Sequence, residues 1–131
     1  MLSHLCLGIG DFDRAFSFYA PLMELLGHRL RFKDAQKPWA AWQPAGDDRP
    51  LLLIGAPFDG GLATPGNGAM VALLAPDRAT VDAGHALALR QGGACEGPPG
   101  LRPQYHPDYY GAYFRDPDGN KLCLVCHRAE G

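Results

Sequence analysis

The sequence has few cysteines, little net charge and no long hydrophobic run, and each of these absences excludes a class of protein. Four cysteines in 131 residues are too few for a disulfide scaffold. A formal net charge of −2 offers no basic surface to phosphate groups, so we expect no nucleic-acid partner. The opening segment MLSHLCLGIGDFD has no basic stretch and reaches an acidic residue at Asp11, unlike a signal peptide or a membrane span. We therefore expect a cytoplasmic protein with no membrane partner.

Motifs for nucleotide and haem cofactors are also missing. The segment GIGDFD starts like a dinucleotide loop but lacks the third glycine and ends on acidic residues that would repel a pyrophosphate. The stretch CLVCH at 123–127 is spelled like a c-type haem attachment site. However, it follows a strong hairpin signal and is predicted to be a strand, where side chains three apart point to opposite faces. We expect neither haem nor a nucleotide cofactor, and there is no P-loop, paired CxxC zinc pattern or nucleophile elbow.

What is present is the pattern of an ordinary globular domain, with 47% hydrophobic and 20% charged residues. The first half predicts a strand, a helix and three strands. Residues 3–9 alternate as a half-buried strand, and an apolar stripe at helical spacing runs from Asp11 or Asp13 to Gly27. Pro21 lies within this helix and is expected to bend or interrupt it. Short apolar runs at 28–32, 39–43 and 51–54 predict the three strands.

The second half repeats this order. Strands are predicted at 69–75, 94–97, 109–115 and 121–127, and a helix within 77–93. Between the last two strands, Asp118-Gly119 is a strong hairpin signal because glycine accepts the positive φ that such turns demand. The repeat predicts a single α+β domain over residues 1–131, with modules at 1–58 and 68–128 and a connector at 59–67.

Strand alternation also predicts which side chains share a face. His4 and Cys6 lie opposite the apolar face of the first strand, and Met70 occupies the same place in the second module. On the last strand, Cys123 shares its face with Lys121, Val125 and His127. If the two sheets close on each other, these faces line a shared concavity that contains His4, Met70 and Cys123.

A long segment rich in proline and glycine, Gly97 to Asp108, is predicted to be a loop that could hold a ligand. With the residues that follow it, the segment presents Arg102, Tyr105, His106 and Tyr109. Aromatic rings with a cation and an imidazole suit a flat or carboxylate-bearing small molecule. The alternative is that these rings only close the end of a barrel.

The repeated unit, the opening SHLCLGIGDFDRAFSFYAPLMELLG and the closing YHPDYYGAYFRDPDGNKLCLVCH resemble the vicinal oxygen chelate superfamily. This superfamily contains glyoxalase I, bleomycin-resistance proteins and extradiol dioxygenases. The resemblance implies an α+β fold in which two βαβββ modules form curved mixed sheets around a central cavity. It also implies a small-molecule site, often with a metal ion, and a homodimer.

The superfamily's metal ligands come from the first and last strands of the two modules. By resemblance, these positions fall on His4, Met70, Cys123 and a place near Leu53. Only His4 matches, because thioether and neutral thiol are poor donors to a divalent ion. Met70 and Cys123 have the plainer alternative of packing residues. We expect a degenerate metal site, and whether a divalent metal ion binds at His4 stays open.

These observations lead to a protein that binds a small organic molecule in its cavity. The predicted binding residues are His4, Met70, Arg102, Tyr105, His106, Tyr109 and Cys123. One alternative is a metal-dependent lyase or dioxygenase of the glyoxalase class that uses His4. Another is a resistance protein that sequesters an antibiotic without catalysis. The sequence does not decide whether the protein is an enzyme.

Overall fold

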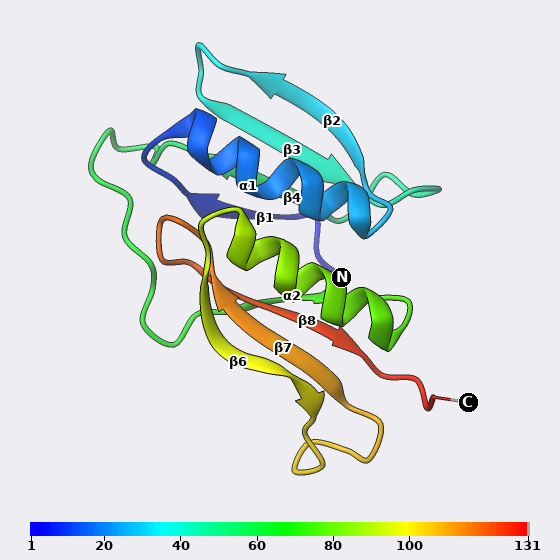
Figure 1. Cartoon of the computed structure of the whole chain (residues 1–131). Helices are drawn as coiled ribbons and strands as arrows, with labels where there is room; N and C mark the ends of the chain where they lie inside the picture. Colours follow the sequence, from blue (N-terminus) through cyan, green and yellow to red (C-terminus); the bar gives the residue numbers. More distant parts are fainter. Residues whose placement is uncertain (131) are drawn as a thin grey trace.

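The computed structural model describes residues 1–130 and contains two mixed sheets and two helices (Figure 1). The elements are β1 (His4–Gly8), α1 (Phe12–Leu25), β2 (Arg29–Asp34), β3 (Trp39–Gln43), β4 (Leu51–Gly55), β5 (Val71–Leu74), α2 (Arg78–Arg90), β6 (Ala94–Leu101), β7 (Tyr110–Arg115) and β8 (Lys121–Cys126). The strand orders are β1-β4-β3-β2 and β5-β8-β7-β6. In each sheet the first pair is parallel and the others are antiparallel. The predicted α+β fold of two βαβββ modules is confirmed.

Both helices begin at an aspartate that caps the first turn. The Asp11 carboxylate accepts a hydrogen bond of 3.0 Å from the Arg14 N–H, and Asp77 accepts one of 2.7 Å from Thr80. The expectation that Pro21 would interrupt the first helix is wrong, because α1 continues through it to Leu25. The lost backbone hydrogen bond is outweighed because the apolar face of the helix is buried on both sides of the proline.

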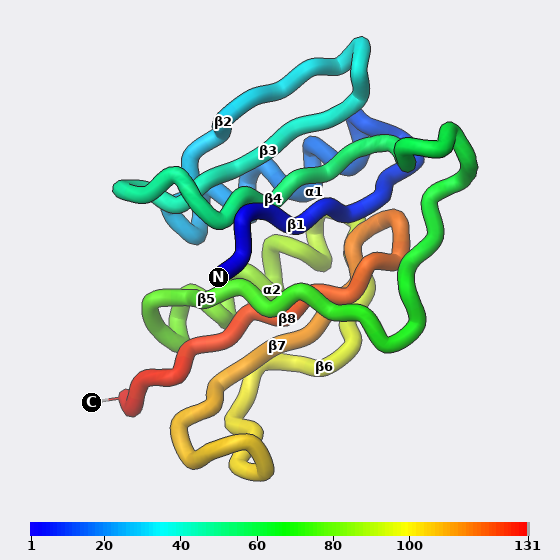
Figure 2. The backbone as a smooth tube through the Cα atoms, turned by 180° about the vertical axis from the view of Figure 1, so that it is seen from behind, coloured from blue at the N-terminus to red at the C-terminus, as the bar shows by residue number. Residues whose placement is uncertain are grey.

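The helices pack against each other as well as against the sheets. In Figure 1 both helices lie on the viewer's side of the strands, and in Figure 2, seen from behind, the strands lie in front. A single main core joins the two modules; its largest fully buried side chains include Phe18, Tyr19, Leu22, Phe114, Leu122 and Leu124. Among residues 1–130, neither helix has the length and apolar character that a membrane crossing requires.

Strand β6 is longer than predicted. The sequence indicates a strand at 94–97 followed by a long loop, but the structure continues β6 to Leu101, through Pro98 and Pro99. In the described part of the chain, strand β6 pairs only with β7, and its register shifts on either side of Gly97. An irregular edge strand tolerates prolines because its outer N–H groups need no partner. The predicted loop is therefore confined to the segment between β6 and β7.

The hairpin between β7 and β8 links the two modules. Gly119 has a φ of +90°, as the Asp118-Gly119 signal predicts. From this turn, Asp118 Oδ1 accepts hydrogen bonds from the Gly10 N–H at 2.8 Å and from Arg14 Nη2 at 3.1 Å. The Asn120 side-chain amide donates to the Gly8 carbonyl at 3.0 Å. The second module's turn thus holds the start of the first module's helix.

A buried carboxylate anchors this hairpin. Asp116 is 3% exposed and accepts from the backbone N–H groups of Asp118 and Asn120 and from the Asn120 side chain, each at 2.9 Å. The Tyr19 hydroxyl of α1 donates to the same carboxylate at 2.5 Å. Burial raises the pKa of Tyr19 well above its ordinary value, and the negative charge of Asp116 raises it further. Asp116 therefore ties the hairpin to α1 through a polar network inside the core.

Candidate functional site

Each sheet has one face free of helices, and these two faces do not form one cavity within the described chain. The hollow on the first sheet has a volume of about 830 Å³ and includes His4, Cys6 and Trp39. The hollow on the second sheet has a volume of about 690 Å³ and includes Met70. The two share no lining residue. The expectation that His4 and Met70 face a shared concavity is therefore wrong for a single chain, although each side chain lies on the predicted face.

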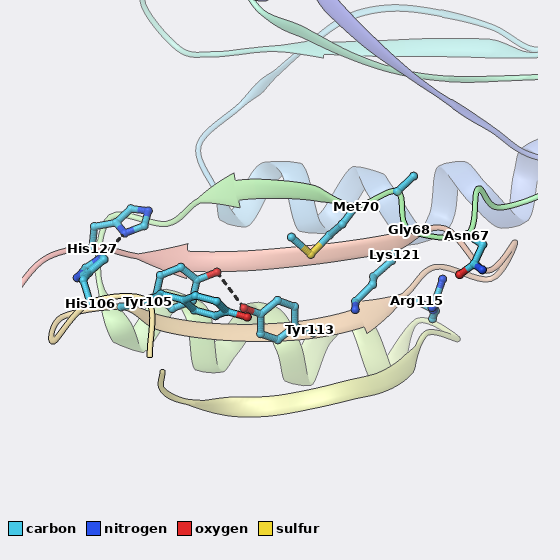
Figure 3. Close-up of a pocket in the computed structure, with 11 residues that line it drawn as sticks. Asn67, Gly68, Met70, Tyr105, His106, Tyr113, Arg115, Lys121 and His127 are labelled. Atoms are coloured by element: carbon cyan, nitrogen blue, oxygen red, sulfur yellow. Dashed lines mark hydrogen bonds between the residues drawn. The ribbon is translucent and has the colours of Figure 1, made fainter. Parts of the chain in front are cut away.

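Three tyrosines and two histidines line the hollow on the second sheet, and we call it the tyrosine groove (Figure 3). It lies over β8 and β7, between the segment before β5 and the loop after β6. Its lining residues are Asn67, Gly68, Ala69, Met70, Tyr105, His106, Tyr109, Tyr113, Arg115, Lys121 and His127. None of these carries a carboxylate side chain.

Two tyrosines form the floor of the groove with a thiol beneath them. The hydroxyls of Tyr109 and Tyr113 are 2.9 Å apart, and the Tyr109 hydroxyl lies 3.6 Å from Cys123 Sγ. Cys123 is 0% exposed and is not among the residues that line the groove. Burial raises the pKa of Tyr109, and the hydrogen bond to Tyr113 raises it further; burial also raises the pKa of the Cys123 thiol. These groups therefore act as neutral hydrogen-bond partners at neutral pH.

A pair of histidines closes one end of the groove. His106 Nε2 lies 2.8 Å from His127 Nδ1, and the Asp108 backbone N–H donates to His106 Nδ1 at 3.1 Å. Because Nδ1 of His106 accepts a hydrogen bond, its proton is on Nε2, which donates to His127. A metal ion on His106 Nε2 would move that proton to Nδ1, against the N–H of Asp108. The geometry therefore fits two imidazoles that hydrogen-bond to each other better than a metal-binding pair.

Positive charge surrounds the Tyr113 ring. Lys121 Nζ lies 5.6 Å from the ring centroid and the Arg102 guanidinium carbon 5.5 Å. Arg102 also donates to the Pro98 carbonyl at 2.7 Å, and Arg115 forms an ion pair of 2.6 Å with Glu96. Lys121 takes part in none of the ion pairs found among residues 1–130. Lys121 is thus the cation of the groove that is best placed to meet a ligand.

The structure brings together four of the residues that the sequence predicts for binding. Met70, Tyr105, His106 and Tyr109 line the tyrosine groove, Arg102 lies at the Tyr113 ring, Cys123 lies beneath the rings, and His4 lies in the other hollow. The prediction did not include Tyr113, Lys121 and His127. The sequence could have predicted Lys121 and His127, because strand alternation places both on the same face as Cys123.

Comparison with known proteins gives the fold a family. The sequence profile of the Glyoxalase/Bleomycin resistance protein/Dioxygenase superfamily matches residues 1–124. The chain belongs to this superfamily. A crystal structure of a glyoxalase/bleomycin resistance protein from Albidiferax ferrireducens T118 is 35% identical, with a TM-score of 0.82 over 98% of this chain and 99% of that one. No curated protein sequence matches the chain.

Two more distant structures share the architecture. A glyoxalase-related enzyme from Fulvimarina pelagi is 23% identical, with a TM-score of 0.71 over 96% of this chain and 87% of that one. TnmS3, an antibiotic binding protein from Streptomyces sp. CB03234, is 25% identical, with a TM-score of 0.64 over 98% of this chain and 96% of that one. The superfamily fold is therefore present over nearly the whole length of each protein.

The residues at the superfamily's metal positions do not fit a metal ion within one chain. His4 Nδ1 hydrogen-bonds to the Ser3 hydroxyl at 2.9 Å, in the hollow of the first sheet. Met70 lies in the other hollow, and the Cys123 thiol is protonated and hydrogen-bonded to Tyr109. Within residues 1–130, no group of three or more histidine, cysteine, aspartate or glutamate side chains could hold a metal ion. We therefore derive no chemical step through a metal.

Proposed function

We propose that the protein binds a flat aromatic molecule that carries a negative charge, in the tyrosine groove. The observation that supports this function is a hollow with three tyrosine rings and a lysine that forms no ion pair within residues 1–130, among lining residues that include no carboxylate side chain. A volume of about 690 Å³ lies within the range of about 300 to 1,000 Å³ that is typical of small-molecule sites.

The side chains suit such a ligand in two ways. Tyrosine rings present wide apolar faces to an aromatic molecule and keep a polar hydroxyl at the edge. Lys121 and Arg102 already lie near the Tyr113 ring, so an aromatic anion that stacks there would meet both a ring face and a positive charge. A cationic ligand would meet the same positive charges and be repelled.

Binding without catalysis agrees best with the side chains at this site. The phenol of Tyr109 and the thiol of Cys123 have raised pKa values, which keep them protonated at neutral pH and leave little phenolate or thiolate to act as a base or nucleophile. The similarity in fold to TnmS3, an antibiotic binding protein, supports a binding role. We therefore favour binding or sequestration over a metal-dependent reaction at His4.

The test uses two probes of the same shape and opposite charge. We expect 1-naphthoate to bind at least tenfold more tightly than 1-naphthylmethylammonium in isothermal titration calorimetry. Opposite charges about 5 Å apart near a protein surface attract by a few kcal/mol before screening, and tenfold in affinity needs only about 1.4 kcal/mol. The preference should shrink at high ionic strength. Equal affinities, or tighter binding of the ammonium probe, would reject an anion-selective groove.

We further propose that the protein forms a homodimer. In this dimer the helix-free face of one copy's first sheet covers the tyrosine groove on the other copy's second sheet and completes the binding site. Phe58 and Leu62 are among the residues that line the hollow of the first sheet, and they are 108% and 94% exposed. Trp39 and Leu53 also line that hollow. Large apolar side chains left fully exposed next to an apolar hollow mark a protein interface. Covering the first sheet with the second sheet of another copy would also enclose the tyrosine groove.

The proposed dimer predicts the mass that the protein shows in solution. At micromolar concentration, light scattering should give twice the mass of 14.1 kDa, and the double variant Phe58→Asp with Leu62→Asp should give the mass of one chain. Two buried carboxylates without partners cost several kcal/mol, enough to dissociate a micromolar dimer. Leu89→Asp, at a position on α2 that is 38% exposed, is the matched control and should stay dimeric. A monomeric native protein would contradict the proposal.

A further inference from the structure

A second pair of reactive side chains lies on the other side of the second sheet from the tyrosine groove. His85 Nε2 lies 3.2 Å from Cys95 Sγ. His85 belongs to α2 and is 7% exposed, whereas Cys95 belongs to β6 and is exposed. The two side chains are neither part of the groove nor of the superfamily's metal positions.

The fold explains why the thiol is both held and accessible. Cys95 pairs with Phe114 of β7, whose side chain lies in the core, so the thiol points to the side covered by α2. Strand β6 is the edge of its sheet, with no strand of residues 1–130 paired to its outer side. The His85 ring packs edge-on to Phe114 at 6.3 Å between centroids, which fixes the imidazole behind the thiol.

The chemistry of this pair is that of a thiol with a neighbouring base. Burial lowers the pKa of His85, and the nearby charge of Asp82 opposes this only in part, so the imidazole is neutral at pH 7. Of the other charged side chains near β6, Glu96 and Arg115 pair with each other, and Arg102 donates to the Pro98 carbonyl. A neutral imidazole 3.2 Å from the sulfur can accept the thiol proton, and the resulting thiolate is the nucleophilic form of cysteine.

We propose that Cys95 and His85 form a nucleophilic pair, and that Cys95 is the residue at which a low-molecular-weight disulfide attaches to this chain. His85 Nε2 takes the proton from Cys95, and Sγ attacks one sulfur of the disulfide. A new S–S bond forms and the original one breaks. The leaving thiolate keeps the bonding electron pair and takes the proton from the imidazolium. Cys95 is oxidised and the released half of the disulfide is reduced to a thiol, so no further reagent is needed.

The other three cysteines are internal controls. Cys6 is exposed but makes no side-chain hydrogen bond to a histidine among the described residues, and burial raises its pKa. Cys123 and Cys126 are buried at 0% and 1% exposure. Modification of either buried thiol would report unfolding. One protein therefore contains an activated thiol, an exposed thiol without a base, and two markers of the native state.

The experiment incubates the native protein with glutathione disulfide at pH 7 and locates the adduct by peptide mass spectrometry. We expect Cys95 to react at least about tenfold faster than Cys6, because only Cys95 has a base beside it. Iodoacetamide rates between pH 6 and 8 provide a second readout. As the pH is lowered, the alkylation rate at Cys6 should fall about tenfold per pH unit, as for an ordinary thiol. The alkylation rate at Cys95 should fall less over the same pH range. Equal rates and equal pH slopes at the two residues would overturn the proposal.

Two variants separate activation from mere exposure. His85→Gln should reduce the Cys95 rate to within about twofold of Cys6, because the amide cannot take up the proton. His28→Gln replaces another histidine whose pKa is lowered by burial, and it should leave the Cys95 rate unchanged. If His85→Gln exposes Cys123 to labelling, the variant is unfolded, and the pH slopes of the native protein decide. A native His85→Gln protein with unchanged Cys95 reactivity would contradict the role of His85.

Discussion

Replacement of Asp116 with alanine is expected to lower the free energy of unfolding by about 3 to 5 kcal/mol. Four groups from three residues donate hydrogen bonds to this carboxylate from inside the fold: the Tyr19 hydroxyl, the Asp118 N–H, and the backbone N–H and side-chain amide of Asn120. Each buried donor that loses its acceptor costs about 1 to 3 kcal/mol. The loss is shared by both modules, because Tyr19 comes from α1 and the other donors from the β7–β8 turn. Urea unfolding followed by circular dichroism measures it.

Two further substitutions test whether the network, and not the charge alone, stabilises the protein. Tyr19→Phe removes one hydrogen bond to a charged group and should cost about 1.5 to 3 kcal/mol, less than Asp116→Ala. Asp108→Ala removes an exposed carboxylate that lies 3.9 Å from Arg78, and it should cost less than about 1 kcal/mol. If Asp116→Ala unfolds at the same urea concentration as Asp108→Ala, the hairpin does not hold the modules together.

This network explains why the closing segment of the sequence is its most informative part. The letters DPDGN predict a hairpin because Gly119 must take a positive φ, and the structure confirms it. The contacts of Asp116 with Tyr19 and of Asn120 with Gly8 join residues 97 and 112 positions apart. Local turn chemistry could not predict these contacts, because they depend on how the modules pack.

In the candidate site, too, strand alternation predicts the face of each side chain but not the neighbours that the side chain meets. Strand alternation correctly places Lys121, Cys123 and His127 on one face, but it does not say which tyrosines of β7 share the groove. The structure places Tyr113 in the groove and turns Tyr110 to the helix side, where its hydroxyl donates to Asp82 at 2.6 Å. The first and second sheets could not be placed relative to each other from periodicity. Alternation gives the face of a strand but not the neighbour that the face meets.

Charge reversal at Lys121 is expected to invert the ligand preference of the tyrosine groove. In Lys121→Glu, 1-naphthoate loses an attraction and gains a repulsion, so its affinity should fall at least about thirtyfold, or about 2 kcal/mol. The same change places a carboxylate near the Tyr113 ring, so 1-naphthylmethylammonium should become the tighter ligand. Lys121→Gln, which removes the charge without reversing it, should narrow the preference for 1-naphthoate without inverting it, because Arg102 still lies at the Tyr113 ring.

The matched control for this prediction is Lys33→Glu, which changes the net charge of the protein by the same amount. Lys33 also lies over an aromatic ring, with Nζ 4.1 Å from the centroid of Phe16, but it belongs to β2 and does not line the groove. Surface charges more than a Debye length away, about 8 to 10 Å at physiological salt, contribute little to binding. Lys33→Glu should therefore keep the preference for 1-naphthoate. An equal loss of 1-naphthoate affinity in both variants would mean that the probe responds to overall charge, and the ligand site would then have to be sought outside the tyrosine groove.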